Sequence, residues 1–306
     1  LCRQCGHVIK CRTCSVSMTC HVRPAATTIQ EQLQLVCHYC GKKTPVPAVC
    51  PECGSKAIRS FGVGTQQVEE KARELFPEAR IQRMDLDSVK KKGSMEAILS
   101  RFAQAKIDVL IGTQLVAKGL DFENVGLVGI ISADVTLNIP DFRSAERTFQ
   151  LVTQAAGRSG RGIETGEVVI QTYSPEHAAI LSAAVHDYKG FYNQEIRLRK
   201  QIEYPPFCDL FQIIIADEEE AKAAGMAGRC AVWLRKKAGD TLSVMGPCAS
   251  PLNKAQGMYR YQVLIKSPAG KRKYTSDLLQ NLKAVHGAEK EKAKLLTMDI
   301  NPYSFL

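Results

Sequence analysis

The chain has 306 residues, and 41 Lys and Arg against 31 Asp and Glu give it a formal net charge of +10. This length allows two or three domains with cores of their own. The excess of positive charge favours a polyanionic partner, such as nucleic acid, over an acidic protein surface or lipid. The sequence has no apolar run near the roughly eighteen residues of a membrane span. It begins at Leu1 without a signal-peptide pattern, so we expect a part of a longer cytoplasmic protein.

Eight of the twelve cysteines lie in four Cys-x-x-Cys pairs within residues 1–57. The pairs are Cys2/Cys5, Cys11/Cys14, Cys37/Cys40 and Cys50/Cys53, and Gly6, Gly41 and Gly54 follow three of them. Thiolate pairs at this spacing, followed by glycine, are typical of zinc knuckles. In the absence of a secretory signal they indicate metal ligation and not disulfides. Because tetrahedral zinc takes four thiolates, eight cysteines predict a module that binds two zinc ions.

Two pairings of these cysteines are possible. Between the second and third pairs lie residues 15–36, which is 22 residues and close to the spacing of zinc ribbons. A nested arrangement follows, with the inner pairs at one ion and the outer pairs at the other. Consecutive pairing, the first pair with the second and the third with the fourth, is the alternative. In either case four thiolates close the coordination sphere, so the ions are structural and not catalytic.

Residues 58–180 alternate between strand and helix patterns. Strands are expected at 58–61, 81–86, 108–112, 125–131 and 167–172, with helices from Thr65 to Phe76, from Met95 to Ala105 and from Ser144 onward. Such alternation indicates an α/β domain with a parallel sheet that helices cover on both faces.

Polar residues follow the strands of this segment. Gly112, Thr113 and Gln114 follow one strand, with Lys118 and Gly119 just beyond, and Asp134 follows the next. The helix from Ser144 leads into Gln154, Arg158 and Arg161. Two arginines three positions apart point the same way and suit a triphosphate, because each guanidinium can fork onto phosphate oxygens. The alternative is two solvated arginines at a helix end.

The stretches GTQLVAKG and QAAGRSGR resemble motifs V and VI of superfamily 2 helicases. With ISAD, DFRSAER and the cysteine block, they make essentially the whole chain resemble the C-terminal part of the PriA family, the bacterial replication restart helicases. This resemblance implies a RecA-like helicase lobe 2 with an inserted two-zinc module, in which four cysteines bind each ion. It also implies an ATP-dependent 3′–5′ DNA helicase that recognises abandoned or stalled replication forks and promotes primosome assembly.

The resemblance also implies roles for single residues. Gln154, Arg158 and Arg161 would face the nucleotide, with the arginines stabilising charge on the transferred phosphoryl group. Gly112, Thr113, Gln114, Lys118, Gly119 and Asp134 would couple the nucleotide to DNA, although Asp134 is equally suited to bracing a loop or capping a helix. The chain has no Gly-x4-Gly-Lys-Ser/Thr loop, so we expect ATP and Mg²⁺ to be bound only in the longer protein and this fragment alone to be inactive.

The last part of the chain reads as a linker helix and a second domain. A helix is expected over 183–201, within a linker at 181–205, and Tyr204 to Phe207 breaks it. Residues 206–306 give strands at 210–216, 242–246, 259–266 and 294–300 and helices at 218–237 and 272–284, which is a βαββαβ order. Its basic residues suit DNA phosphates or are simply solvated; they are Lys254, Arg260, Lys266, Lys271, Arg272 and Lys273.

Partners follow from the resemblance alone: forked or junction DNA, single-strand-binding protein and other primosome proteins, in the bacterial cytoplasm at the nucleoid and not at a membrane. Two rival readings remain at this point. One is a zinc-dependent DNA-binding or primosome assembly protein without ATPase activity. The other is a cysteine-rich redox protein without zinc.

Overall fold

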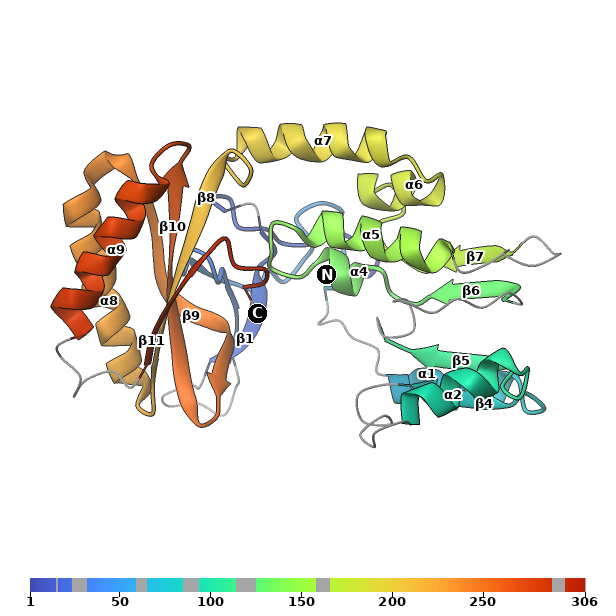
Figure 1. The fold of residues 1–306 in the computed structure, drawn as a ribbon. Helices are drawn as coiled ribbons and strands as arrows, with labels where there is room; N and C mark the ends of the chain where they lie inside the picture. Colours follow the sequence, from blue (N-terminus) through green and yellow to red (C-terminus); the bar gives the residue numbers. More distant parts are fainter. Residues whose placement is uncertain are drawn as a thin grey trace. The chain divides into compact units, whose positions relative to one another are not determined.

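A computed structural model describes residues 1–14, 16–23, 32–58, 65–84, 94–113, 125–157, 166–287 and 295–305 (Figure 1). The chain divides into two compact units. The first unit comprises Leu1–His7, Ala57–Leu137 and Ser144–Phe191, and the second comprises Val8–Lys56, Asn138–Arg143 and Tyr192–Leu306. Within the described ranges, no helix is both long enough and apolar enough to cross a membrane.

The first unit contains two parallel strand pairs. Strand β4 (Ile81–Met84) pairs with β5 (Val109–Gly112), and β6 (Leu127–Ile130) pairs with β7 (Glu167–Ile170). Helix α1 (Thr65–Leu75) precedes β4 in the chain, and helix α2 (Ser94–Ala103) connects β4 to β5. Met84, Ile98 and Ile107 form a small core between α2 and the β4–β5 pair. The parallel pairing and the βα alternation expected from the sequence are both present.

Helices pack against the β6–β7 pair. They are α5 (Ser144–Ala156), α6 (Ala178–Ala184) and the start of α7 (Tyr188–Gln201), while the short helix α4 (Asp134–Leu137) packs against α5. The buried core here includes Phe149 and Val152 of α5, Ile180 of α6 and Phe191 of α7. The rings of Phe149 and Phe191 stack with centroids 4.6 Å apart and planes 2° from parallel.

The prediction of a single helix over 183–201 is wrong, because two helices, α6 and α7, occupy this part of the chain. The chain breaks between α6 and α7, where His186 has a φ of +53°. Asp187 then starts α7, because its Oδ1 accepts a hydrogen bond of 2.8 Å from the backbone N–H of Gly190. An aspartate that binds an amide at this distance along the chain is a helix N-cap. The continuous helical pattern of the sequence concealed this cap.

The second unit is built on a four-stranded antiparallel sheet in the order β11-β8-β10-β9. The strands are β8 (Cys208–Asp217), β9 (Ser243–Ala255), β10 (Met258–Pro268) and β11 (Leu295–Ile300). Helix α8 (Glu220–Ala238), a 3₁₀ turn (Gly239–Thr241) and helix α9 (Arg272–Gly287) connect them, so the element order is βαββαβ. Both helices contribute to one core with β8 and β10.

Strand β9 is much longer than the 242–246 expected from the sequence. Pro247 follows the expected end, and proline cannot donate a ladder hydrogen bond. The strand order places β9 at the edge of the sheet, where proline is tolerated, and the register of β9 with β10 shifts opposite Pro247, between Gln262 and Leu264. The strand therefore continues to Ala255.

The cysteine-bearing segment of the second unit shares a core with this sheet. It forms a small antiparallel sheet of β1 (Thr19–Arg23), β2 (Gln32–Val36) and β3 (Lys43–Pro45). The cluster that joins it to the larger sheet consists of Cys11, Cys14, Val16, Cys37, Tyr39, Tyr204, Cys208, Leu210, Leu264 and Phe305. Residues 8–56 belong to the same compact unit as the C-terminal sheet.

The stacked pair of phenylalanines gives a first prediction. Phe149→Ala should lower the free energy of unfolding by about 3–5 kcal/mol, because it removes a buried ring and leaves a cavity beside Phe191. Leu198→Ala on α7 is the control, since that side chain is 48% exposed. Equilibrium urea denaturation measures both, and equal effects of the two substitutions would show that the stack does not stabilise the unit.

Candidate functional site

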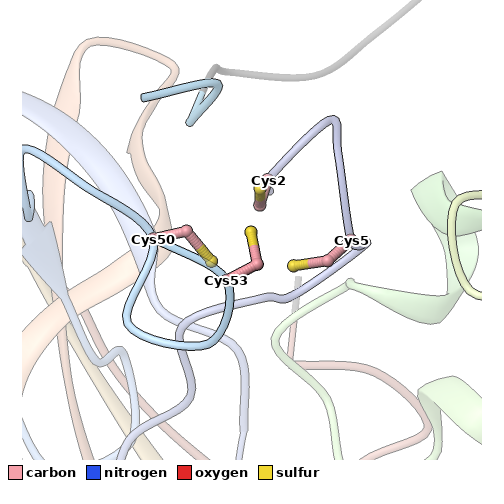
Figure 2. A group of neighbouring side chains, drawn as sticks. All are labelled: Cys2, Cys5, Cys50 and Cys53. Atoms are coloured by element: carbon pink, nitrogen blue, oxygen red, sulfur yellow. The ribbon is translucent and has the colours of Figure 1, made fainter. Parts of the chain in front are cut away.

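The structure gathers the eight paired cysteines into two groups. One group is Cys2, Cys5, Cys50 and Cys53, and the other is Cys11, Cys14, Cys37 and Cys40, with all sulfurs of a group within 4.8 Å of one another. We call the first the outer group and the second the inner group. Figure 2 shows the four side chains of the outer group converging from two separate turns. The grouping is the nested one.

Each pair sits in the same kind of turn. In three pairs the glycine N–H donates to the carbonyl of the first cysteine, at 2.8–2.9 Å for Gly6, Gly41 and Gly54. These glycines have φ values of +73°, +78° and +71°, in the left-handed region where a side chain is strained. A left-handed residue after the second cysteine closes the turn and lets both sulfurs point to one side. This is why the sequence places glycine there.

The two groups differ in their surroundings. Cys2 and Cys50 of the outer group are buried, while Cys5 and Cys53 are exposed. In the inner group Cys11, Cys14 and Cys37 are buried and Cys40 is half-buried. The inner thiols lie in the core beside Tyr39 and Tyr204, whereas the outer thiols face solvent on one side.

The pKa values of three inner thiols are shifted by burial and by one another. A hydrogen bond from Cys14 lowers the pKa of Cys37 to about 5, and the same hydrogen bond, followed by burial, raises the pKa of Cys14. Burial raises the pKa of Cys40 to about 11. A divalent cation would complete this set of four closely spaced sulfurs, because the ion supplies the charge that opposes their ionised form.

Both groups fit a tetrahedral ion. Zinc–sulfur bonds of about 2.3 Å place four sulfurs at the corners of a tetrahedron, with edges of roughly 3.8 Å. The sulfurs of Cys11 and Cys40 are 3.6 Å apart, and every other separation within a group is at most 4.8 Å. The two four-cysteine groups could therefore each bind zinc in a closed site.

The remaining cysteines and the nearby histidines lie outside the two groups. Cys20 is exposed, and Cys208, Cys230 and Cys248 are buried thiols. His38 lies in the knuckle of Cys37 and Cys40 but is not one of the grouped residues. Its side chain is 1% exposed, and its Nδ1 donates to the carbonyl of Ala249 at 2.8 Å.

Several of the nucleotide and DNA residues expected from the sequence fall on parts of the chain that the structure does not describe. These are Gln114, Lys118, Gly119, Arg158 and Arg161. Gly112 ends β5, and Thr113 follows it with an exposed side chain. Gln154 lies in the last turn of α5 and is also exposed. Thr113 and Gln154 are therefore accessible to a ligand.

Asp134 has a clear structural role. It begins α4 just after β6 and is fully buried. Its Oδ2 accepts a hydrogen bond of 2.9 Å from the backbone N–H of Tyr173, in the loop that follows β7. The carboxylate thus braces one loop against another at the carboxyl ends of two adjacent strands. This contact is the loop-bracing alternative that the sequence left open.

Three residues with structural roles were missed by the sequence analysis. Arg143 donates to the carbonyls of Pro302 at 2.7 Å and Tyr303 at 2.6 Å, and so holds the C-terminal segment. Gln212 and Gln262 are buried in the central strands β8 and β10 and hydrogen-bond to each other at 2.6 Å. A glutamine inside an otherwise apolar strand was a readable signal, whereas nothing local marked Arg143 as an anchor.

The basic residues of the C-terminal domain also divide. Lys266 is half-buried, and its Nζ donates to the carbonyl of Ile202 at 2.8 Å and lies 4.0 Å from the ring centroid of Tyr204. Burial lowers the pKa of Lys266. Lys266 therefore does not belong to an exposed basic face, unlike Lys254, which is exposed and lies 4.3 Å from the ring centroid of Tyr259.

Two parts of the chain match known protein families. Residues 55–163 match the family described as "Helicase conserved C-terminal domain", so this part of the chain is a helicase lobe. Residues 200–303 match the "Primosomal protein N C-terminal domain". The chain belongs to the PriA family, whose C-terminal portion it represents.

The relatives are similar over most or all of the chain. "Replication restart protein PriA" of Bacillus subtilis is 45% identical over 307 residues, covering 100% of this chain and 37% of the relative. The protein of the same name from Synechocystis is 39% identical over 268 residues (88% and 32%), and that of Haemophilus influenzae is 36% identical over 308 residues (99% and 40%). The chain thus spans about a third to two-fifths of the length of these relatives.

The knuckle glycines allow a matched test of the outer group. A Cβ on Gly6 would stand 2.1 Å from the backbone oxygen of Tyr173, whereas one on Gly54 would meet nothing within 4 Å. Both glycines have nearly the same positive φ. Gly54→Ala should therefore cost only the left-handed strain, about 1–2 kcal/mol.

Gly6→Ala should cost clearly more than Gly54→Ala, because the backbone must also move away from Tyr173. Thermal unfolding and metal content of the two variants measure the difference. If both variants behaved alike, the close approach of the first knuckle to the loop after β7 would not contribute to stability.

Proposed function

We propose that this chain is the C-terminal part of an ATP-dependent 3′–5′ DNA helicase that recognises abandoned or stalled replication forks and promotes primosome assembly. The observation that carries this proposal is the match of residues 55–163 to a helicase domain, inside a chain whose relatives bear the name replication restart protein PriA. That stretch contains the residues of both helicase-like motifs, from Gly112 to Gly119 and from Gln154 to Arg161.

The proposed part of this chain in ATP hydrolysis is electrostatic. ATP with Mg²⁺ supplies the reactive phosphoryl group, and another part of the longer protein grips it. Arg158 and Arg161 neutralise charge that develops on the γ-phosphoryl oxygens, and Gln154 faces the nucleotide beside them. The exposure of Gln154 at the end of α5 supports this role, because a side chain that reaches a ligand must not be committed to the core.

DNA coupling is assigned to the loop that follows β5. Gly112, Thr113, Gln114, Lys118 and Gly119 offer backbone amides, a hydroxyl and a cation to DNA phosphates, which are contacts without sequence preference. Asp134 acts indirectly, by holding the loop after β7 through Tyr173. The positive charge of the whole chain supports binding to DNA.

The two cysteine groups are proposed as zinc sites that hold shape. Cys2, Cys5, Cys50 and Cys53 bind one ion, and Cys11, Cys14, Cys37 and Cys40 bind the other. Four thiolates leave no open position, so neither ion activates water or substrate. We further propose that the protein works in the bacterial cytoplasm at the nucleoid, with forked DNA, single-strand-binding protein and other primosome proteins as partners.

The arginine assignment is tested in the complete protein. Arg161→Ala should reduce DNA-stimulated ATPase activity by about 10³-fold or more, because the transition-state charge loses a stabilising cation, while DNA affinity stays unchanged. Gln150→Ala is the control, since Gln150 is an exposed glutamine one turn before Gln154 on α5. Unchanged ATPase activity of Arg161→Ala would exclude the assignment and favour an assembly protein without motor activity.

The zinc assignment is tested by metal analysis. The purified chain should contain two zinc ions, and Cys37→Ser should contain one, because serine is a much poorer zinc ligand than a thiolate. Cys20→Ser is the control and should retain both, since Cys20 lies outside the groups. A metal-free chain with eight titratable thiols in these pairs would contradict the proposal and favour a redox protein.

A further inference from the structure

The turn that carries Cys37 and Cys40 lies directly against strand β9. A Cβ on Gly41 would stand 2.9 Å from the backbone oxygen of Pro247 and 3.2 Å from the Cβ of Cys248. One residue further along β9, the carbonyl of Ala249 accepts the hydrogen bond from His38 Nδ1 at 2.8 Å. The inner knuckle is therefore in close contact with the main chain of the edge strand.

The backbone carbonyl of His38 accepts two hydrogen bonds from the sheet. One comes from Gln262 Nε2, on β10, and the other from Cys248 Sγ at 2.8 Å, on β9. The Gln262 amide is held in turn, because its Oε1 accepts from Gln212 Nε2, on β8, at 2.6 Å. Gln262 is 0% exposed and Gln212 is 4% exposed, so water does not compete for these contacts. A polar chain thus runs from the middle of the sheet to the knuckle.

The hydrogen-bonded carbonyl and a donor to the metal ligand belong to one peptide group. The C=O of His38 and the N–H of Tyr39 lie in one plane and point in opposite directions, because the peptide bond is planar and trans. The N–H of Tyr39 hydrogen-bonds to the sulfur of Cys37, as does the N–H of Cys40. Donors that fix the carbonyl therefore also aim the N–H at the sulfur, and they polarise it toward stronger donation.

We propose that Gln262, held by Gln212, is a positioning residue of the inner metal centre and acts on Cys37 through the His38–Tyr39 peptide. This inference rests on the proposed binding of a metal ion by the inner group. Residues behind the ligands commonly set ligand orientation and affinity in metal sites. The glutamine thereby links metal binding at the knuckle to the folded state of the C-terminal sheet.

The test uses the full chain loaded with cadmium, whose ¹¹³Cd resonance reports the surroundings of each thiolate site. The resonance of the inner centre is the one that Cys37→Ser removes. Gln262→Met should shift that resonance alone and weaken cadmium and zinc retention at the inner centre by roughly 10–100-fold against a chelator. The outer centre should be unchanged. Gln280→Met is the matched control, because Gln280 is an exposed glutamine on α9.

Two results would overturn the inference. If Gln262→Met lowered thermal stability but left the resonance and the metal retention of the inner centre as in Gln280→Met, Gln262 would only pack the core, while the zinc proposal would stand. If the unmodified chain held no ion at the inner group, the zinc proposal and this inference would both fail.

A milder pair of variants keeps the test usable if Gln262→Met does not fold. Cys248→Ala removes the second donor to the His38 carbonyl, whereas Cys248→Ser keeps a donor at the same position. The alanine variant should weaken retention at the inner centre, and the serine variant should restore most of it. Equal weakening by both would show that the sulfur of Cys248 matters only for packing and would contradict a role for donors to this carbonyl.

Discussion

The burial of the inner thiols is the constraint on which the second unit depends. Cys11, Cys14 and Cys37 are each at most 2% exposed, and they lie in a core with aromatic rings. Ionised sulfur in such surroundings is costly unless an opposing charge and hydrogen-bond donors accompany it. The inner cysteines share this core with the sheet, so binding of the proposed cation would be coupled to the folding of both.

Distant parts of the second unit converge on the same core. The hydroxyl of Tyr204 donates a hydrogen bond of 2.8 Å to the carbonyl of Cys14. The ring of Tyr204 stacks on that of Phe142, with centroids 4.8 Å apart. Phe305 lies against Tyr39 with centroids 5.0 Å apart. Arg143 then ties the C-terminal segment down by two backbone carbonyls. The short segment at residues 138–143 and the last residues therefore pack around the cysteine-bearing segment, although neither contains a cysteine of the two groups.

Patterns that are local in sequence predicted local structure well. The four cysteine pairs with their glycines predicted the turns, and the alternation of strand and helix predicted the parallel pairs β4–β5 and β6–β7. Local patterns also gave wrong boundaries for one strand and one helix. The strand expected over 242–246 was too short, because β9 continues past Pro247 to Ala255, and an uninterrupted helical pattern concealed the cap at Asp187. What could not be predicted is tertiary: the burial of His38, the anchoring by Arg143 and the contact of the knuckle with β9 all join residues more than a hundred positions apart.

The two cysteine groups offer the same kind of ligand, four thiolates, but the charge of each proposed metal site must be stabilised in a different way. A zinc ion bound by four thiolates leaves a net charge of 2 − 4 = −2. At the outer group Cys5 and Cys53 are exposed, so water can solvate that charge. At the inner group the core excludes water from most of the sulfurs. Backbone N–H groups such as those of Tyr39 and Cys40 must therefore stabilise the negative charge in place of water. Those amides work only if the knuckle holds its shape, which explains why a buried polar chain from Gln212 through Gln262 ends at this turn.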